Sequence, residues 1–175
     1  DVLKTLPKRQ FNNGLCESIK MAATSDSELF KILEENNAED IIDTVIEKSL
    51  LIKKQVVEED EKETGLRKVL NFGHTIGHAI ETVTGLEELY HGECVALGML
   101  PMCSSSVKER LLKVLKKIGL PTNISSNVDS VISAIGHDKK FDGETITVIF
   151  VNTPGEYEMK NITKKELCPF VKEVF

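Results

Sequence analysis

The chain has 175 residues, a length that fits one compact domain or a piece of a larger protein. Its hydrophobic fraction of 41% and charged fraction of 29% are ordinary for a soluble globular protein. A formal charge of −6 argues against a chain dedicated to nucleic acid, whose binding domain would be net basic. This charge still leaves room for a local cationic pocket that binds an anionic substrate.

Apolar runs and cysteines indicate the expected compartment. No apolar run approaches the roughly 18 residues that a membrane-spanning helix needs. The opening segment, DVLKTLPKRQF, lacks the apolar core of a signal peptide. The four cysteines show no paired CxxC spacing. We therefore expect a cytoplasmic protein without membrane contact, whose cysteines are reduced and mostly buried.

Three helices are predicted in the first third of the sequence. The first is expected over 11–23, with Asn12 or Asn13 as its cap. A short helix follows over 24–36, where Ser and Asp residues precede an apolar run. A long amphipathic helix is expected over 38–63.

The rest of the sequence predicts more helices and one hairpin. Helices are expected over 67–84, 93–100 and 107–119. The segment ETITVIFV, the turn NTPG and the segment EYEMK form a hairpin pattern, and a last short helix is expected from Thr163. No GxGxxG motif or strand–helix alternation is present, so a dinucleotide-binding fold is not expected. The expected fold class is mainly α, with a small β-hairpin.

The helix expected over 67–84 carries one polar stripe. Its members follow one another at steps of 4, 3, 4 and 3 residues, which places them on one helical face: Arg67, Asn71, His74, His78 and Glu81. The same helix contains two glycines, each of which costs a helix about 1 kcal/mol relative to alanine. The spacing of Gly73 and Gly77 suggests that another backbone packs closely here.

Three of the four histidines, His74, His78 and His91, lie within eighteen residues of one another. His74 and His78, four apart on a helix, could bind one metal ion, or one of them could be a ligand and the other a hydrogen-bonding group. His91 stands in HGE, just before a predicted helix, where a ligand from a loop could converge on the stripe. Spacing alone does not choose the ligands.

Acidic and basic residues elsewhere allow two interpretations. Glu17 and Lys20 are neighbours on one helical face, and such pairs are most often solvated salt bridges. The alternative is that Glu17 is a metal ligand and Lys20 binds an anion. Lys53 and the lysines of HDKK are by default surface residues. A cluster of Lys20, Lys53, Lys139 and Arg67 would instead suit a carboxylate- and phosphate-bearing substrate.

Several motifs together resemble the 3-dehydroquinate synthase family, of the sugar-phosphate cyclase group. The strongest similarity is in EEDEKETGLRKVLNFGHTIGHAIE, followed by YHGECVALGM. Further similarity occurs in TLPKRQFNNGLCESIK, KKIGLPT and HDKKFDGETITVIFV. These segments occur in the family's order and cover almost the whole chain.

The resemblance implies a domain organisation. Family enzymes have an N-terminal NAD-binding α/β domain and a C-terminal, mainly helical metal-binding domain. Residues 1–175 resemble the second domain alone, a single C-terminal metal- and substrate-binding domain of the dehydroquinate synthase-like fold, without the NAD-binding domain. The chain by itself is then expected to be inactive, and the full-length protein to be a homodimer.

The resemblance also implies roles for individual residues. It makes Glu17, His74 and His91 the ligands of a divalent metal ion, usually Zn²⁺, with Co²⁺ or another divalent metal as alternatives. Catalytic roles fall to Lys20, Lys53 and His78. The implied substrate-binding residues are Lys20, Lys53, Arg67, Asn71, His78 and Lys139, with Lys140 the less favoured lysine of the HDKK motif.

The implied activity is that of a lyase, in which 3-deoxy-D-arabino-heptulosonate 7-phosphate becomes 3-dehydroquinate and phosphate. This step belongs to the shikimate pathway of aromatic amino acid biosynthesis. NAD transiently oxidises a ring hydroxyl, which acidifies the adjacent proton for phosphate elimination. Reduction, ring opening and an intramolecular aldol closure follow, without net redox change.

Three other functions fit the residues less well. The first is another sugar-phosphate cyclase, such as 2-deoxy-scyllo-inosose synthase. The second is an iron-type alcohol or glycerol dehydrogenase, which would transfer hydride with net redox change. The third is a helical metal-binding module without activity. The pairing of Arg67 with Asn71 and the run GHTIGHA favour dehydroquinate synthase.

Overall fold

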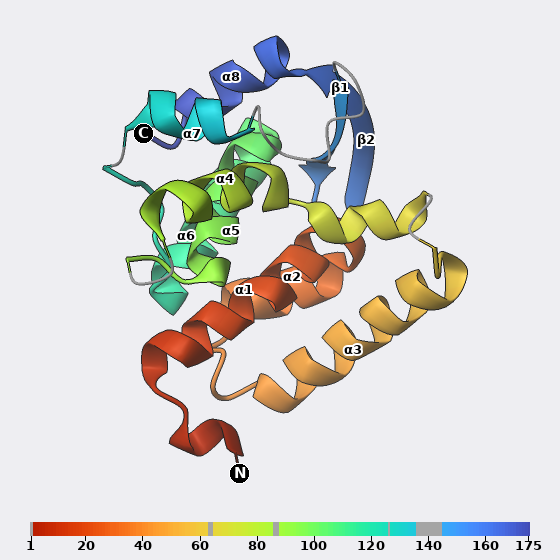
Figure 1. The fold of residues 1–175 in the computed structure, drawn as a ribbon. Coiled ribbons are helices and arrows are strands. Elements are labelled where there is room, and N and C mark those ends of the chain that lie inside the picture. The colour runs from red at the N-terminus through yellow and green to blue at the C-terminus, as the bar shows by residue number, and fades with distance from the viewer. Residues whose placement is uncertain (1, 63–64, 86–87, 126, 136–144) are drawn as a thin grey trace.

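The computed structural model describes residues 2–62, 65–85, 88–125, 127–135 and 145–175. Figure 1 shows α1, α2 and α3 at one end of the molecule, α4, α5 and α6 in the middle, and the hairpin with α7 and α8 at the other end. In chain order, with η for a 3₁₀ helix, the elements are η1 (Val2–Thr5), α1 (Lys8–Ser25), α2 (Ser27–Glu35), α3 (Ile42–Glu59), η2 (Leu66–Asn71), α4 (His74–Thr84), α5 (His91–Met99), η3 (Leu100–Met102), α6 (Ser105–Ile118), α7 (Val128–Ile135), β1 (Thr145–Thr153), β2 (Glu156–Thr163) and α8 (Lys164–Lys172).

The expectation of a mainly helical domain with one hairpin is confirmed, but the start of α1 was predicted wrongly. The helix begins at Lys8, directly after Pro7. Proline has a fixed φ and no N–H to satisfy, so it can precede a helix without a side-chain cap. Asn12 and Asn13 therefore lie inside the helix and are not caps. The amide oxygen of Asn13 instead accepts a hydrogen bond of 2.7 Å from the Gly92 N–H.

The continuous helix predicted over 67–84 is also wrong. It is divided into η2 and α4, and Gly73 stands between them with a φ of 76°. This left-handed conformation is easily adopted by glycine and interrupts a right-handed helix. The polar residues from Arg67 to Glu81 therefore belong to two elements and do not form one helical stripe.

Glycines let α4 and α5 approach each other, as the sequence suggested. A Cβ atom on Gly73 would lie 2.5 Å from Met99 Cγ, and one on Gly77 would lie 3.0 Å from Val95 Cα. On α5, a Cβ on Gly98 would lie 2.0 Å from the Gly73 carbonyl oxygen. Any of these contacts would be a steric clash or nearly so, so side chains are excluded from this helix–helix interface.

The hairpin covers one end of the helical core. Strands β1 and β2 are antiparallel, with Thr145 opposite Thr163 and Phe150 opposite Glu158, and the register shifts before Thr153. The inner face of β1 is apolar and buried, and its Val151 forms an isolated bridge to Cys103. Thr163 caps α8, as predicted, and its hydroxyl accepts a hydrogen bond from the Glu166 N–H.

Other sequence expectations have mixed outcomes. Helix α7 was not predicted, and α3 starts at Ile42, later than expected. The HDKK segment lies outside the described residues. All four cysteines are free and three are buried. Of the helices in the described ranges, none is long and apolar enough to cross a membrane.

Candidate metal and substrate site

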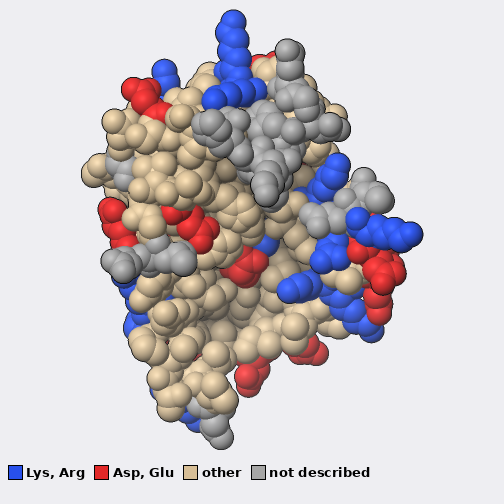
Figure 2. Space-filling model, viewed as in Figure 1, with Lys and Arg blue, Asp and Glu red and all other residues tan. Residues whose placement is uncertain are grey.

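A pocket of about 360 Å³ opens where α1, α3, η2 and α4 meet. Figure 2 shows basic side chains gathered beside a hollow in this face of the molecule, on the side where α3 ends in Figure 1. The pocket is lined by Glu17, Lys20, Met21, Lys53, Arg67, Leu70, Asn71 and His74. Three of these side chains are cations, so the pocket suits an anionic ligand.

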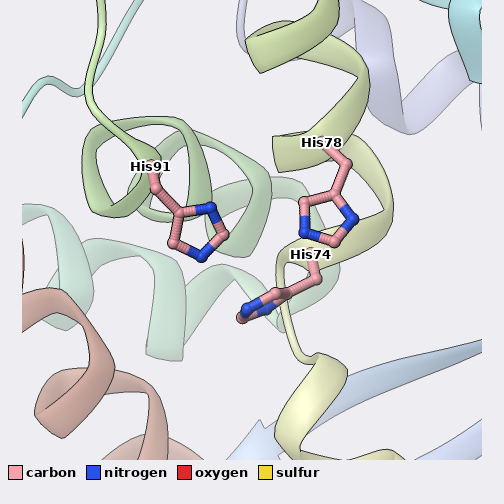
Figure 3. A group of neighbouring side chains, drawn as sticks. All are labelled: His74, His78 and His91. Atoms are coloured by element: carbon pink, nitrogen blue, oxygen red, sulfur yellow. The ribbon is translucent and has the colours of Figure 1, made fainter. Parts of the chain in front are cut away.

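Three imidazoles meet at the edge of this pocket. Figure 3 shows His74 and His78 on α4 and His91 at the start of α5, with their rings turned toward one another. Within the part of the chain that the structure describes, their donor atoms form a group that lies within 4.8 Å of one another. Ring centroids are 5.3 Å apart for His74 with either partner and 5.7 Å apart for His78 with His91.

Glu17 faces two of these imidazoles. Its Oε1 atom lies 3.7 Å from His74 Nε2 and 3.9 Å from His91 Nε2. Oε1 is buried and has no hydrogen-bond partner, whereas Oε2 accepts a hydrogen bond of 2.6 Å from Lys20. Ligand atoms bound about 2.1 Å from a tetrahedral zinc ion are roughly 3.4 Å apart. The unpartnered oxygen and the two nitrogens therefore fit a divalent metal ion with little rearrangement.

The second nitrogen of each of these rings has its own partner. His74 Nδ1 lies 3.1 Å from the Phe72 carbonyl oxygen, which can only accept a hydrogen bond. His91 Nδ1 lies 3.1 Å from Glu81 Oε2. In both rings, Nδ1 has an oxygen partner and Nε2 faces Glu17, which is the arrangement usually found for metal-binding histidines.

Electrostatics favour the protonation states that metal ligands need. Burial, reinforced by the Lys20 ammonium, lowers the pKa of His74 to about 4, so the ring is neutral at pH 7. Burial alone would raise the pKa of Glu17, but the charge and hydrogen bond of Lys20, together with the charges of His74 and His91, bring the net pKa below its ordinary value. A neutral imidazole and an ionised carboxylate can both bind a cation without first losing a proton.

Lys20 is buried, so the interpretation of a solvated salt bridge is wrong. Only 4% of its side chain is exposed, compared with 39% for Glu17. A buried ammonium is costly unless it is paired. Lys20 lines the pocket and is paired with the Glu17 carboxylate through the hydrogen bond of 2.6 Å.

Asp60 was missed by sequence reasoning. It follows the last residue of α3, and its Oδ2 accepts hydrogen bonds of 2.7 Å from the Gly65 N–H and 2.9 Å from the Arg67 N–H. These bonds hold the start of η2, which carries Arg67. The helix predicted over 38–63 includes Asp60, whereas α3 ends at Glu59, so that the Asp60 carboxylate can bond nearby backbone N–H groups.

Comparison with known proteins identifies the family. The family model described as "3-dehydroquinate synthase C-terminal" matches residues 14–141. The chain belongs to this family. It is 42% identical to 3-dehydroquinate synthase of Campylobacter concisus over 94% of this chain and 51% of the relative. For the Clostridium acetobutylicum 3-dehydroquinate synthase the identity is 40% over 98% of this chain and 52% of the relative. The chain thus spans about half the length of the curated relatives it matches.

Solved structures confirm the dehydroquinate synthase-like fold. A 2-epi-5-epi-valiolone synthase from Streptomyces hygroscopicus subsp. jinggangensis, with NAD⁺ and Zn²⁺ bound, matches with a TM-score of 0.83 at 25% identity, over 98% of this chain and 53% of that chain. A 2-deoxy-scyllo-inosose synthase complexed with carbaglucose-6-phosphate, NAD⁺ and Co²⁺ matches with a TM-score of 0.78 at 23% identity, over 98% of this chain and 54% of that one.

The structure brings most of the family-derived site residues together. Glu17, Lys20, Lys53, Arg67, Asn71 and His74 all line the pocket. His78 and His91 lie beside His74. Lys54, the neighbour of Lys53, is 3.8 Å from Glu58 on the surface. Lys139 and Lys140 lie outside the described residues, so their placement stays a prediction.

The start of α5 is fastened to α1, which sets His91 opposite Glu17. Arg9 donates two hydrogen bonds of 2.7 Å to the carboxylate of Glu93, which also accepts one of 2.8 Å from the Tyr90 N–H. The expectation that His91 lies in a loop just before a helix is wrong, because His91 is the first residue of α5. Sequence reasoning missed Arg9 because its partner is distant along the chain.

Proposed function

We propose that this chain is the metal- and substrate-binding half of a 3-dehydroquinate synthase. The complete enzyme would be a lyase of the shikimate pathway that converts 3-deoxy-D-arabino-heptulosonate 7-phosphate into 3-dehydroquinate and phosphate. The observation that carries the proposal is the buried, unpartnered Oε1 of Glu17, which faces two imidazoles beside a cationic pocket in a member of this family.

Glu17, His74 and His91 would hold a divalent metal ion, Zn²⁺ or Co²⁺. Support comes from the donor set and from the two similar proteins, one bound to Zn²⁺ and the other to Co²⁺. When bound, the ion would supply Lewis acidity that lowers the pKa of a substrate hydroxyl. One carboxylate and two imidazoles leave coordination positions open for that hydroxyl.

The remaining pocket residues would bind and orient the substrate. Arg67 and Lys53 would pair with its carboxylate and phosphate, and Asn71 would hydrogen-bond a hydroxyl. Lys20 would attract a negatively charged group of the substrate to a position close to Glu17. His78 would contact the phosphate and carry a proton, because an imidazole can donate or accept near neutral pH. Lys139 would add a further cation.

NAD would be bound mainly by an N-terminal domain outside residues 1–175. When bound, it would supply a hydride acceptor that returns the hydride later, so the reaction has no net redox change. The support is that the relatives are twice as long as the stretch matched and that the similar solved proteins contain NAD⁺. The isolated chain would then be inactive, and the full-length protein would be a cytoplasmic homodimer.

The test uses a polypeptide in which this chain follows an NAD-binding domain of the family. Phosphate release is measured with 3-deoxy-D-arabino-heptulosonate 7-phosphate and, separately, with glucose 6-phosphate. We expect release from the heptulosonate alone. Release from the hexose phosphate alone would instead assign a 2-deoxy-scyllo-inosose synthase activity, and NADH that accumulates with an alcohol would assign a dehydrogenase.

A further inference from the structure

Glu81 contacts the imidazole of His91 at Nδ1, the ring nitrogen that does not face Glu17. The Glu81 Oε2 atom lies 3.1 Å from His91 Nδ1, whereas the other ring nitrogen, Nε2, is the one near Glu17. Glu81 belongs to α4, one turn beyond His78, whereas His91 begins α5. The contact therefore joins α4 to the start of α5, at one of the three histidines drawn in Figure 3.

His91 needs such a partner more than His74 does. The side chain of His74 is 11% exposed and is held by surrounding atoms and by the Phe72 carbonyl. The side chain of His91 is 41% exposed, so packing restrains its ring far less. Its separation of 3.9 Å from Glu17 is too long for a hydrogen bond. Glu81 is then the group that orients the ring.

The chemistry of a carboxylate fixes which ring nitrogen carries the proton. An ionised carboxylate only accepts hydrogen bonds, so His91 Nδ1 must be the donor. The lone pair then resides on Nε2, which points toward Glu17. A carboxylate partner also makes the imidazole a more basic ligand than a carbonyl partner does. The two imidazoles therefore differ in their partners. The partner of His74 is a neutral backbone carbonyl, and the partner of His91 is a carboxylate.

The place of Glu81 in its helix argues against a role in helix stability. It lies in the last turn of α4, which runs from His74 to Thr84. Negative charge near a helix C-terminus is unfavourable by about 0.3–1 kcal/mol because of the helix dipole. A residue that only stabilised α4 would be neutral or basic here, so the carboxylate is better explained by its contact with His91.

We infer that Glu81 is a positioning residue that holds His91 in its Nδ1–H form and aims Nε2 at the metal ion. The inference rests on the proposed metal site of Glu17, His74 and His91. It extends that site by a residue that touches neither substrate nor metal and acts through His91. The substitution Glu81→Gln keeps an acceptor oxygen but removes the charge, whereas Glu81→Ala removes both.

The experiment compares Glu81→Ala and Glu81→Gln with the unaltered chain. Ring-nitrogen NMR of the metal-free chain reports the tautomer of His91, and the visible spectrum during Co²⁺ titration reports metal affinity. The control is Glu109→Gln, which removes a carboxylate whose hydrogen bond and ion pair are with Lys113, both side chains being 71% exposed. Thermal unfolding of the metal-free variants checks that each is folded.

We expect Glu81→Ala to weaken Co²⁺ binding about 10–100-fold, as is typical for partners of metal-binding histidines. The Nδ1–H form of His91 should also lose its dominance. Glu81→Gln should have a smaller effect, and Glu109→Gln none. Undiminished Co²⁺ affinity in a folded Glu81→Ala chain would overturn the inference and leave the metal site intact. Absence of Co²⁺ binding by the unaltered chain would overturn both.

Discussion

Glu17 places a buried carboxylate oxygen beside two imidazole nitrogens without any hydrogen bond to satisfy it. Leaving a buried polar group unpaired costs about 1–3 kcal/mol, and more for a charged one. A protein keeps such a group when something other than folding requires it. A cation between Glu17, His74 and His91 would offset that cost, so we connect the unpaired oxygen with metal binding.

His78 distinguishes two possible ligand sets. Geometry alone also allows a site made of three imidazoles, His74, His78 and His91. If Glu17, His74 and His91 are the ligands, Glu17→Ala and His74→Ala should weaken Zn²⁺ binding by more than about 100-fold, because losing a ligand costs more than losing a ligand's partner. His78→Ala should change Zn²⁺ affinity by less than about tenfold. Competition with a chromophoric chelator measures each affinity.

A His78→Ala chain that loses Zn²⁺ affinity as severely as His74→Ala would contradict this ligand set. It would favour the three-imidazole site, with Glu17 as a neighbour of the metal only. Circular dichroism of each metal-free variant serves as the control, because a loss of helical signal would make the two affinities incomparable.

At the residue scale, local spacing made part of the site predictable. His74 and His78 are four apart, and Glu17 and Lys20 are three apart, so sequence alone placed each pair on one face. The partners of Arg9 and Asn13 could not be predicted, because they lie about eighty residues away along the chain. The burial of Lys20 could not be predicted from the sequence either, because lysine side chains are nearly always exposed.

At the scale of elements, α4 and α5 are held at short distance by glycines. Gly77→Ala places a methyl group 3.0 Å from the Val95 backbone, inside a close-packed interface. We expect a loss of about 1–3 kcal/mol in the free energy of unfolding, as for other overpacked positions. Urea unfolding, followed by circular dichroism, measures this change.

Gly14→Ala is the matched control. Gly14 lies within α1, and a Cβ atom there would have open space around it. Alanine is a better helix former than glycine, so this variant should be about 0.5–1 kcal/mol more stable. If Gly77→Ala were as stable as Gly14→Ala, close packing would not be the reason for glycine in α4.

Element boundaries show where sequence reasoning ends. Hydrophobic periodicity identified most helices and the hairpin, because those patterns are local. It extended one helix through Gly73, because the positive φ of this glycine is not visible in hydrophobic periodicity. It also missed α7, whose eight residues are too few for a clear period.

At the scale of the whole molecule, the site is an open pocket where α1 meets three later elements, α3, η2 and α4, that follow one another along the chain. The pocket collects cations in a chain whose formal charge is −6, so its charge is a local property of the fold. Solved proteins of similar fold are about twice as long as the stretch they share with this chain. The proposed function would place the metal and the substrate on this half of the enzyme and the hydride acceptor on the other half.

The most direct measurement of this division is phosphate release from 3-deoxy-D-arabino-heptulosonate 7-phosphate, with Zn²⁺ and NAD present in every sample. The polypeptide that joins this chain to an NAD-binding domain should release one phosphate per substrate without accumulation of NADH. The chain alone should release none. Failure of the joined, folded and Zn²⁺-loaded polypeptide to release phosphate would contradict the account, as would release by the chain alone at the same rate.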